Sequence, residues 1–360
     1  MEKCITMDRI NDNSFYHLLL KGLSENWNND HKDNFDFIRF GTPEREIVNP
    51  QKNLNEIEQY LDEIESMYFL LGDERSKGIL LQLLAFRILG HRKVRLPLSQ
   101  PLYFETIEKL SQYIDTQNEL DVKFPSTTRR LYYADLANLN LPMKLFTTPA
   151  IILVQFLLKQ YEYTTDESIV IGAMPGDIVI DGGACWGDAT LFFADRVKED
   201  GQVYSFEFIP ESLDVFKKNM QLNPRLAKSV KMVERALWSE SNVKTYYRNG
   251  GTGSNVSMQK LDGYNGLVNT ITIDDLVSQE HLPGVDLIKM DIEGAEQHAL
   301  KGAEETLRRF TPKLAITIYH NMSDFANIIH KIDDMNLGYK FYLGHFTIFH
   351  EETVLFAAKP

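Results

Sequence analysis

The chain has 360 residues and a formal net charge of −13 at pH 7, from 51 acidic and 38 basic residues. This length accommodates one large domain or two ordinary ones, and it allows a sizeable core without disulfides or metals. The acidic balance argues against binding to nucleic acid, which requires a positive surface, and the sequence contains no basic run. We therefore expect a globular protein with no nucleic-acid partner.

Cysteine usage and hydropathy indicate the compartment. Cys4 and Cys185 are the only cysteines, and their positions suggest neither a disulfide framework nor a metal site. The longest apolar run, residues 151–158, is far shorter than the ~20 residues of a spanning helix. No signal peptide opens the chain. We predict a cytoplasmic protein without a membrane span.

Helical periodicity dominates the first third of the chain. Apolar residues recur at helical spacing over 54–71 and again over 74–89, with acids on the opposite face of the first segment. Prolines punctuate the residues that follow, and we place a loose boundary near Pro125. We predict a helical N-terminal region over 1–125 and a second domain over 126–360.

The second domain alternates between strand-like and helix-like segments. Strands are expected at 176–182, 202–208, 230–237, 285–291 and 314–320, and helices at about 187–198, 211–221, 295–309 and 323–335. A β excursion is expected between 244 and 268. The last two strands, 339–343 and 353–358, have a connection too short for a crossover helix, so we expect them to pair antiparallel. The pattern predicts an α/β fold.

A glycine-rich segment carries the strongest functional signal. Asp181, Gly182 and Gly183 end the first strand of the second domain, and Gly187 follows after three residues. Glu207 comes twenty residues after Gly187 and lies at the carboxyl end of the next strand. Open parallel sheets bind ligands beyond the carboxyl ends of their strands, so Glu207 lies where the ribose of a nucleoside cofactor would lie.

Two cofactors compete for this site. NAD binding uses G-x-G-x-x-G, in which the pyrophosphate rests on a helix N-terminus, and the spacing here departs from that fingerprint. Asp181 would repel a pyrophosphate but would attract the α-ammonium of S-adenosylmethionine (SAM). The alternative without a ligand is that the glycines only turn the chain. With the terminal hairpin, the pattern predicts a Rossmann-like sheet of the SAM-dependent methyltransferase type.

A second motif makes a family resemblance specific. Residues 286–296 have the sequence Asp-Leu-Ile-Lys-Met-Asp-Ile-Glu-Gly-Ala-Glu, and Leu-Lys-Gly-Ala follows at 300–303. With the glycine segment and the terminal residues 339–355, this stretch resembles the FkbM-type family of SAM-dependent methyltransferases, over roughly residues 130–360. The resemblance implies methyl transfer from SAM, usually to a hydroxyl oxygen. The acceptor would be a small molecule or saccharide, such as a natural product or a sugar of a bacterial surface glycan.

The resemblance also implies cofactor contacts, which lie at or just after strand ends: Asp181, Gly182, Gly183, Gly187, Asp188, Glu207, Phe208, Ala236, Leu237 and Asp291. Glu207 would bind the ribose diol through two acceptor oxygens. Phe208 would lie beside the adenine, and Ala236 with Leu237 would present backbone to its edge. Many SAM enzymes have an acid near this last strand end. Here Glu234 lies two residues before Ala236, and its role is open.

Asp291 and Glu293 lie two apart at a strand end, so both carboxylates can face one cleft. Three interpretations are open. The pair binds a hard cation such as Mg²⁺, with His320 as a further ligand. The pair positions the acceptor hydroxyl and the sulfonium. Or Asp291 is functional while Glu293 stabilises the N-terminus of the helix that begins near Ala295.

His320 ends the fifth strand and is expected at the rim of the same cleft. Methylation of a hydroxyl requires removal of its proton, and an imidazole with a pKa near ~6.5 suits that task at neutral pH. His320 is therefore the candidate general base, and a surface histidine or a metal ligand is the alternative. His345, in the terminal hairpin connection, is the competing base.

Two further segments are weaker candidates. Residues 250–255 form a Gly-rich polar string that is either a loop over the cleft or a simple turn. Residues 160–163, Gln-Tyr-Glu-Tyr, precede the first strand of the second domain, and the resemblance makes them candidates for the mouth of the cofactor site. Two rival functions remain: an NAD-linked oxidoreductase or epimerase, and a non-catalytic SAM-fold subunit that binds a partner. A homo-oligomer is compatible with the sequence.

Overall fold

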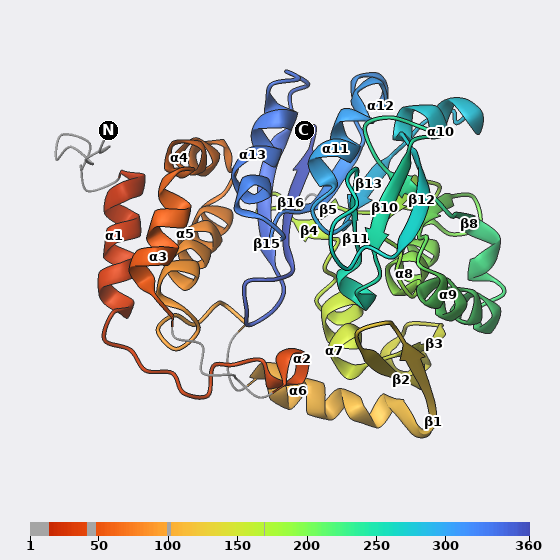
Figure 1. The fold of residues 1–360 in the computed structure, drawn as a ribbon, viewed down its shortest axis with the longest axis horizontal. Coiled ribbons are helices and arrows are strands. Elements are labelled where there is room, and N and C mark those ends of the chain that lie inside the picture. The colour runs from red at the N-terminus through yellow and green to blue at the C-terminus, as the bar shows by residue number, and fades with distance from the viewer. Residues whose placement is uncertain (1–13, 42–47, 99–101, 169) are drawn as a thin grey trace.

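The computed structural model describes residues 14–41, 48–98, 102–168 and 170–360, except the side chain of Thr252. Its centre is a seven-stranded sheet (Figure 1). In spatial order the strands are β15 (Lys340–His345), β16 (Thr353–Ala358), β14 (Lys313–Thr317), β13 (Leu287–Met290), β6 (Ile178–Gly182), β7 (Gln202–Phe206) and β8 (Val230–Val233). Neighbours pair parallel, except that β16 is antiparallel to both β14 and β15. The predicted α/β, Rossmann-like sheet with an antiparallel C-terminal hairpin is confirmed.

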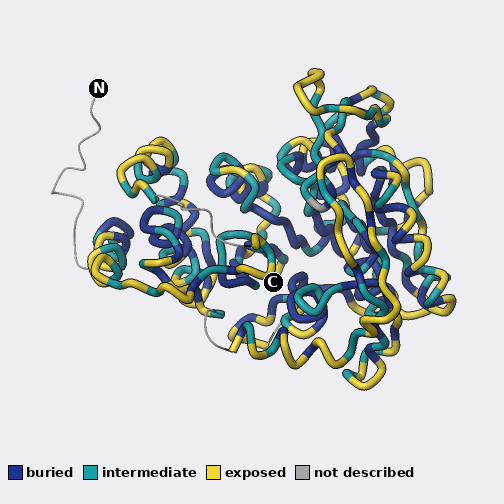
Figure 2. The backbone as a smooth tube through the Cα atoms, turned by 60° about the horizontal axis from the view of Figure 1, so that its bottom comes forward, coloured by how far each residue is buried: buried dark blue, intermediate teal, exposed yellow. Residues whose placement is uncertain are grey.

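Alternating side chains of the central strands fill two cores, one on each face of the sheet. Val179, Leu287 and Ala315 belong to one cluster, and the residues that follow each of them belong to the other. Because both faces are covered, these strands are apolar without a polar side, as parallel strands usually are. Buried backbone accordingly runs through the middle of the molecule (Figure 2).

The helices of the second domain connect the parallel strands. They are α8 (Asp188–Val197), α9 (Pro210–Leu222), α10 (Ile273–Gln279), α11 (Glu296–Lys301), α12 (Glu304–Phe310) and α13 (Met322–Asp333). The helix predicted over 295–309 is thus two helices. Gly302 lies at the break, where an added Cβ would be 2.2 Å from the carbonyl oxygen of Trp238. This close passage of two backbones requires a glycine and interrupts the helix.

The third predicted strand is also divided. β8 ends at Val233, and Ala236–Leu237 form a separate strand, β9. β9 pairs with β12 (Gly266–Ile271) in a four-stranded sheet that also contains β10 (Lys244–Arg248) and β11 (Asn255–Ser257). The β excursion predicted between 244 and 268 is therefore present. The last two residues of the third predicted strand form β9 and belong to this second sheet rather than to the main sheet.

The N-terminal region contributes six helices among the described residues. They are α1 (Phe15–Asn26), α2 (Phe37–Phe40), α3 (Pro50–Glu58), α4 (Leu61–Leu70), α5 (Glu74–Leu89) and α6 (Leu102–Leu110). α5 lies along the edge strand β15, where the amide of Leu343 donates to Ser76 Oγ at 2.9 Å. The amide of Gly72 donates to the carbonyl of Phe341 at 2.8 Å. The apolar side chains of α5 share one core with the sheet.

The helical character predicted for residues 1–125 does not reach Pro125. β1 (Ile114–Lys123) pairs antiparallel with β2 (Thr128–Asp135), which pairs with β3 (Lys144–Thr147). The expected boundary therefore lies in the turn of a hairpin, because cross-strand pairing joins residues on both sides of it. The position of the boundary between the two predicted domains therefore stays a prediction.

A short irregular helix leads from β3 to the sheet. α7 (Pro149–Ile151) continues into a π-helix, Ile152–Leu157, and the short strands β4 (Tyr163–Thr164) and β5 (Val170–Ile171) follow. None of the helices in the described part of the chain has the length and apolar character needed to cross a membrane.

Candidate active site

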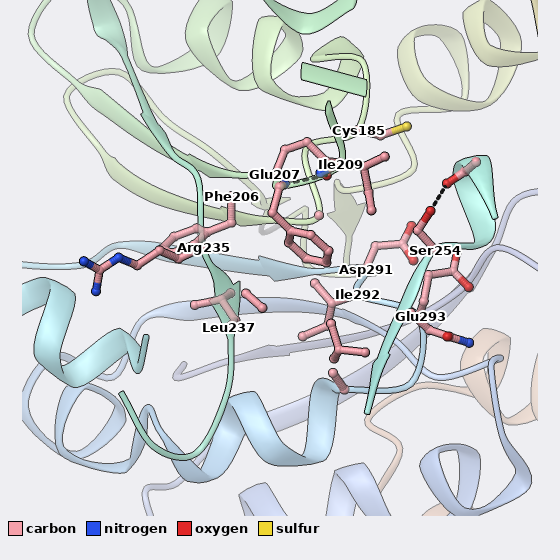
Figure 3. A pocket seen from close by; sticks show the side chains of 17 residues that line it. Cys185, Phe206, Glu207, Ile209, Arg235, Leu237, Ser254, Asp291, Ile292 and Glu293 are labelled. Carbon is pink, nitrogen blue, oxygen red and sulfur yellow. Dashed lines mark hydrogen bonds between the residues drawn. The ribbon is translucent and has the colours of Figure 1, made fainter. Parts of the chain in front are cut away.

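Two cavities meet at the carboxyl ends of β6, β7 and β13. The narrower one, here called the slot, has about 600 Å³ of empty space. Its lining residues are Gly183, Cys185, Phe206, Glu207, Phe208, Ile209, Arg235, Ala236, Leu237, Gly251, Ser254, Asn255, Val256, Asp291, Ile292, Glu293 and Ala295. In Figure 3, Asp291, Glu293 and Ser254 lie together at one end of the slot, and Arg235 lies at the other.

The second space, here called the wide cavity, has about 1300 Å³ of empty space. The slot and the wide cavity share four lining residues, Gly183, Cys185, Asp291 and Glu293. The two spaces therefore form one cleft. A ligand that filled the slot would present its end to the wide cavity beside Asp291 and Glu293.

The predicted glycine turn forms the floor where the two cavities meet. Gly183 has φ +81°, and an added Cβ would lie 1.9 Å from the carbonyl oxygen of Asp291. Gly187 has φ +83°, and its Cβ would contact Phe216 at 2.8 Å. Both positions need glycine because the backbone is left-handed and closely packed. Gly182 lies beneath this turn at the end of β6, and neither Gly182 nor Gly187 lines either cavity.

Asp181 lies below the cleft rather than in its wall. It is fully buried, and Oδ1 lies 3.1 Å from Lys289 Nζ. Thr190 Oγ1 donates to Oδ2 at 2.6 Å. Lys289 also donates to the carbonyls of Gly182 and Gly183, at 3.0 and 2.8 Å. Direct contact of Asp181 with a cofactor therefore stays a prediction. In the structure Asp181 pairs with Lys289, which in turn donates to the carbonyls of the glycine turn.

Glu207 lies at the carboxyl end of β7 and lines the slot. Its Oε1 accepts from the amides of Phe208 and Ile209, at 2.6 and 2.7 Å. Burial raises the pKa of Glu207 to about 7, although these amides oppose the shift. The amides fix the carboxylate at one end, so its other oxygen can face a ligand.

The predicted adenine neighbours Phe208, Ala236 and Leu237 all line the slot. Glu234 does not; it lies on the surface, 3.2 Å from Lys217. The acid considered near the third strand therefore does not contact this space. Asp188 begins α8 and lines the wide cavity, where burial raises its pKa to about 6.

Asp291 lines both cavities and accepts several hydrogen bonds. Tyr161 donates to Oδ2 at 2.9 Å, while Thr317 and Tyr319 lie 3.2 and 3.4 Å from Oδ1. Glu293, two residues on, has a left-handed φ of +57°. Such a conformation is costly for a residue with a side chain and occurs often at functional sites.

The interpretation of Glu293 as a helix cap is not supported by the structure. α11 begins after Ala295, and its acidic first-turn residue is Glu296. Glu293 instead lines both cavities, and its Oε2 lies 3.5 Å from His320 Nε2. Burial is the main cause that raises the pKa of Glu293 to about 8; the charge of His320 opposes this shift, and the charge of Asp291 adds to it.

His320 lies behind this wall, and three carboxylates surround it. Nδ1 is 3.2 Å from Glu296, and Nε2 is 3.4 Å from Asp291. Burial by itself lowers the pKa of His320, but the carboxylates, Glu296 first, raise it to about 10. An imidazole with this pKa is protonated at neutral pH and has no lone pair to accept a proton. The geometry therefore weighs against the predicted role of His320 as general base.

The metal set predicted from the sequence was Asp291, Glu293 and His320. Among the described residues, the group close enough to hold an ion is Asp291, Glu296 and His320, so Glu296 takes the place of Glu293. Mg²⁺ prefers oxygen ligands in octahedral geometry, and this group supplies carboxylates from two residues. The three side chains form an ion-pair network, and metal binding stays a prediction.

His345 is placed apart from the cleft. It lies buried in β15, and Nδ1 is 3.0 Å from Thr353 Oγ1. It lines neither the slot nor the wide cavity. Burial lowers the pKa of His345 to about 3. The expectation that it competes as the base is not supported, because the hairpin turns its side chain into the core.

The weaker candidate segments do reach the cleft. Gly251, Ser254 and Asn255 line the slot, so the polar string lies over it. Of the predicted segment 160–163, Gln160 and Tyr161 line the wide cavity, whereas Glu162 and Tyr163 line neither space. Several residues of the site had no assigned role in the sequence, among them Lys289, Glu296, Arg39 and Tyr103. Lys289 could have been noticed in the sequence, because it is a lysine inside the otherwise apolar strand β13. No sequence pattern indicates Arg39 or Tyr103, because they come to the wide cavity from helices that are distant in the sequence.

Comparisons with known proteins bear on the family and the fold. Residues 171–341 match the model of the methyltransferase FkbM domain, which confirms the resemblance found in the sequence. No curated protein matches the chain. The fold is similar to that of methyltransferase FkbM from Methylobacillus flagellatus KT, with a TM-score of 0.53 and 17% identity. The alignment covers 84% of this chain and 60% of that protein, so this chain spans less than two thirds of the relative.

Two other solved structures show weaker likeness. Aeropyrum pernix fibrillarin, which was crystallised with natively bound SAM, has a TM-score of 0.34 and 12% identity, with 63% of this chain and 93% of that one covered. An rRNA methylase from Streptococcus thermophilus has a TM-score of 0.34 and 13% identity, with 52% and 89% covered. These scores are too low to carry an argument about function.

Proposed function

We propose that this chain, which carries an FkbM methyltransferase domain over residues 171–341, transfers the methyl group of SAM to a hydroxyl oxygen. The acceptor is a small molecule or saccharide, such as a sugar, a glycan precursor or a natural-product precursor. One observation supports this best: the slot and the wide cavity join at Asp291 and Glu293. A cofactor in one space and an acceptor in the other would meet there.

The slot has the chemistry that a nucleoside requires. Phe206, Leu237 and Ile292 give apolar walls for a flat base, and Glu207 supplies one carboxylate for a diol. The glycine segment has Ala184 where the dinucleotide fingerprint has its second glycine, and α8 begins with an acid, Asp188. Asp188 lines the wide cavity, and we propose that it holds the ammonium group of SAM there. SAM, when bound, supplies a methyl group on a sulfonium, which needs no metal for transfer.

The residues at the junction would orient the acceptor and take its proton. Asp291 is fixed by Tyr161, Thr317 and Tyr319, so it can hold the acceptor hydroxyl in line with the methyl group. Glu293 faces both cavities, and a carboxylate in a dry site is a stronger base than one in water. We assign the general base to Glu293 rather than to His320. His320 then acts as a positioning residue that neutralises the neighbouring carboxylates.

Calorimetric titration tests the cofactor. We expect micromolar binding of S-adenosylhomocysteine (SAH), the product of SAM, and no binding of NAD. Binding of NAD alone would contradict the methyltransferase function and favour an oxidoreductase or epimerase. Binding of neither would favour a non-catalytic subunit. A screen of hydroxylated acceptors with labelled SAM, with and without EDTA, then tests O-methylation, and loss of turnover with EDTA would restore the metal hypothesis.

A further inference from the structure

The wide cavity combines a polar junction with apolar side chains from other elements. Where it meets the slot, Asp291 and Glu293 line it. Apolar and aromatic side chains come from α2, α6, α7 and the π-helix: Phe40, Tyr103, Ala150, Ile151 and Val154. A ligand that fills the cavity therefore meets carboxyl groups at the junction and apolar side chains elsewhere.

The same cavity also has donors that nothing in the described chain satisfies. Arg39, Gln155 and Trp186 line it, and Arg39 Nη1, Gln155 Nε2 and Trp186 Nε1 have no partner among the described residues. Buried donors in native proteins nearly always have a partner, either in the protein or in ordered water. Oxygen atoms of a ligand, neutral or anionic, can serve as partners here. The part of the ligand that enters the cavity can therefore be rich in oxygen.

The apolar lining continues out of the cavity onto the surface. Phe40 lines the cavity and is nevertheless 43% exposed. Phe37 lies three residues earlier, on the same face of α2, and is 57% exposed. Its ring stacks on that of Phe104 in α6, with the centroids 4.8 Å apart (Figure 1). Leu102, the first residue of α6, is 66% exposed. We call Phe37, Phe40, Leu102 and Phe104 the apolar patch.

Polar contacts hold the apolar patch at the cavity. Asp36, the N-cap of α2, is fully buried and accepts from the amide of Arg39 at 3.1 Å. Its other carboxylate oxygen accepts from the hydroxyl of Tyr103 at 3.2 Å, which joins α2 to α6. The Arg39 side chain pairs with Glu352 of the last hairpin. These contacts fix α2 between the second domain and α6, so Phe37 and Phe40 stay beside the cavity.

We infer that the acceptor is amphipathic, with its reacting hydroxyl group at Asp291 and Glu293 and an alkyl or aromatic part against the apolar patch. This inference rests on the proposed function, because it takes the wide cavity as the acceptor site. Exposed apolar patches mark binding surfaces, and Phe40 makes this patch continuous with the cavity. A second copy seated there would cover Phe40, and the net charge of −13 opposes approach to an anionic lipid surface.

Two alkyl glucosides test the apolar part of the acceptor. Methyl and octyl β-D-glucopyranoside carry the same sugar and differ only in the length of the alkyl chain. We would titrate each into the protein with bound SAH and measure its affinity by ligand-detected NMR, below the critical micelle concentration of the octyl compound. Because each buried methylene adds to affinity, we expect the octyl compound to bind at least ~10-fold more tightly. Equal affinities, or no binding of either compound, would overturn the inference.

Two variants localise the preference for the longer chain. Phe37→Ser removes an exposed ring of the apolar patch and should reduce the preference several-fold. Phe69→Ser is the matched control, because Phe69 is 63% exposed and belongs to α4, which lines neither cavity. It should leave the preference unchanged. A preference that survives in Phe37→Ser, or that falls equally in both variants, would show that the chain binds elsewhere and would overturn the inference.

The other possible occupants of the apolar patch are tested on the same proteins. Analytical ultracentrifugation measures self-association, and co-sedimentation with phosphatidylcholine vesicles measures membrane binding. We expect neither to change in Phe37→Ser, and loss of either one in this variant would assign the patch to a second copy or to a membrane and overturn the inference. SAH binding separates the two proposals: its absence in the wild type contradicts the proposed function, whereas intact SAH binding without a chain-length preference contradicts only this inference.

Discussion

The slot and the wide cavity differ in how the chain builds them. Every lining residue of the slot lies between Gly183 and Ala295, within one part of the second domain. The wide cavity takes Arg39 from α2, Tyr103 from α6, Gln155 from the π-helix and Glu352 from the last hairpin. In the proposed function, cofactor binding thus depends on local motifs at strand ends, whereas acceptor binding depends on how remote segments pack together.

The same difference in origin explains why the two spaces differ in their carboxyl side chains. Glu207 is the carboxyl side chain that the slot has to itself, and Asp291 and Glu293 line both spaces. The wide cavity adds Asp188, Glu351 and Glu352, which come from two other segments. A shared cofactor needs one recurring surface, while each acceptor needs its own. We therefore expect substitutions in the two halves to separate cofactor binding from turnover, unless they affect the floor that both halves share.

The shared floor should give the largest effect. Lys289→Met leaves Asp181 as a buried charge without its partner, and breaking a buried pair in this way costs about 3–5 kcal/mol. Urea unfolding should show this loss, and SAH binding and turnover should fall together. The double variant Asp181→Asn, Lys289→Met is the control, and it should recover part of the stability. A Lys289→Met protein as stable as the wild type would show that the pair does not hold the floor.

Glu293→Gln should impair turnover while cofactor binding persists. Loss of a general base lowers the rate by about 10²- to 10⁴-fold. Because the pKa of Glu293 is raised to about 8, its basic form accumulates above that pH, and wild-type turnover should rise with pH through this region. The variant should lose this rise and retain SAH affinity. A similar pH profile in Glu293→Gln would exclude Glu293 as the base, and loss of the profile in His320→Gln alone would restore His320.

Glu207→Ala should weaken SAH binding by about 10- to 100-fold, since hydrogen bonds to a charged group contribute about 1.5–3 kcal/mol. Because burial raises the pKa of Glu207 to about 7, its ionised form is lost as pH falls, and wild-type affinity should weaken below that pH. Calorimetry at pH 6 and pH 8 measures both effects. Glu234→Ala, at a surface acid outside the slot, is the matched control. Equal losses in the two variants would contradict the assignment.

His345→Gln should give the smallest effect. The change removes the contact with Thr353 Oγ1 but touches neither cavity. We expect a stability loss of about 0.5–1.5 kcal/mol, as for a typical hydrogen bond, and turnover within about 2-fold of the wild type. Thermal unfolding and steady-state kinetics measure these quantities. A drop in turnover as large as that of Glu293→Gln would return His345 to the active site.

Sequence patterns predicted the fold well where each strand is covered on both faces. The continuous apolar segments around Val179 and Leu287 indicated buried strands, and their alternation with helices indicated that these strands are parallel. The same patterns failed at residue 237, because β9 leaves the main sheet to pair with β12. The boundary predicted near Pro125 lies in a hairpin turn, and it stays a prediction. The difference at residue 237 concerns a strand partner, which no local pattern specifies.

The sequence by itself determined the slot, because its glycines and Glu207 lie at fixed spacings along one βαβ unit and backbone geometry carries those spacings into space. Tertiary structure alone decided the protonation of His320 and the composition of the wide cavity. Desolvation and the distances between charges control the former, and packing of distant segments controls the latter. A pKa and a cavity wall are properties of neighbours in space, so residues such as Glu296 and Arg39 acquire their roles only in the folded chain.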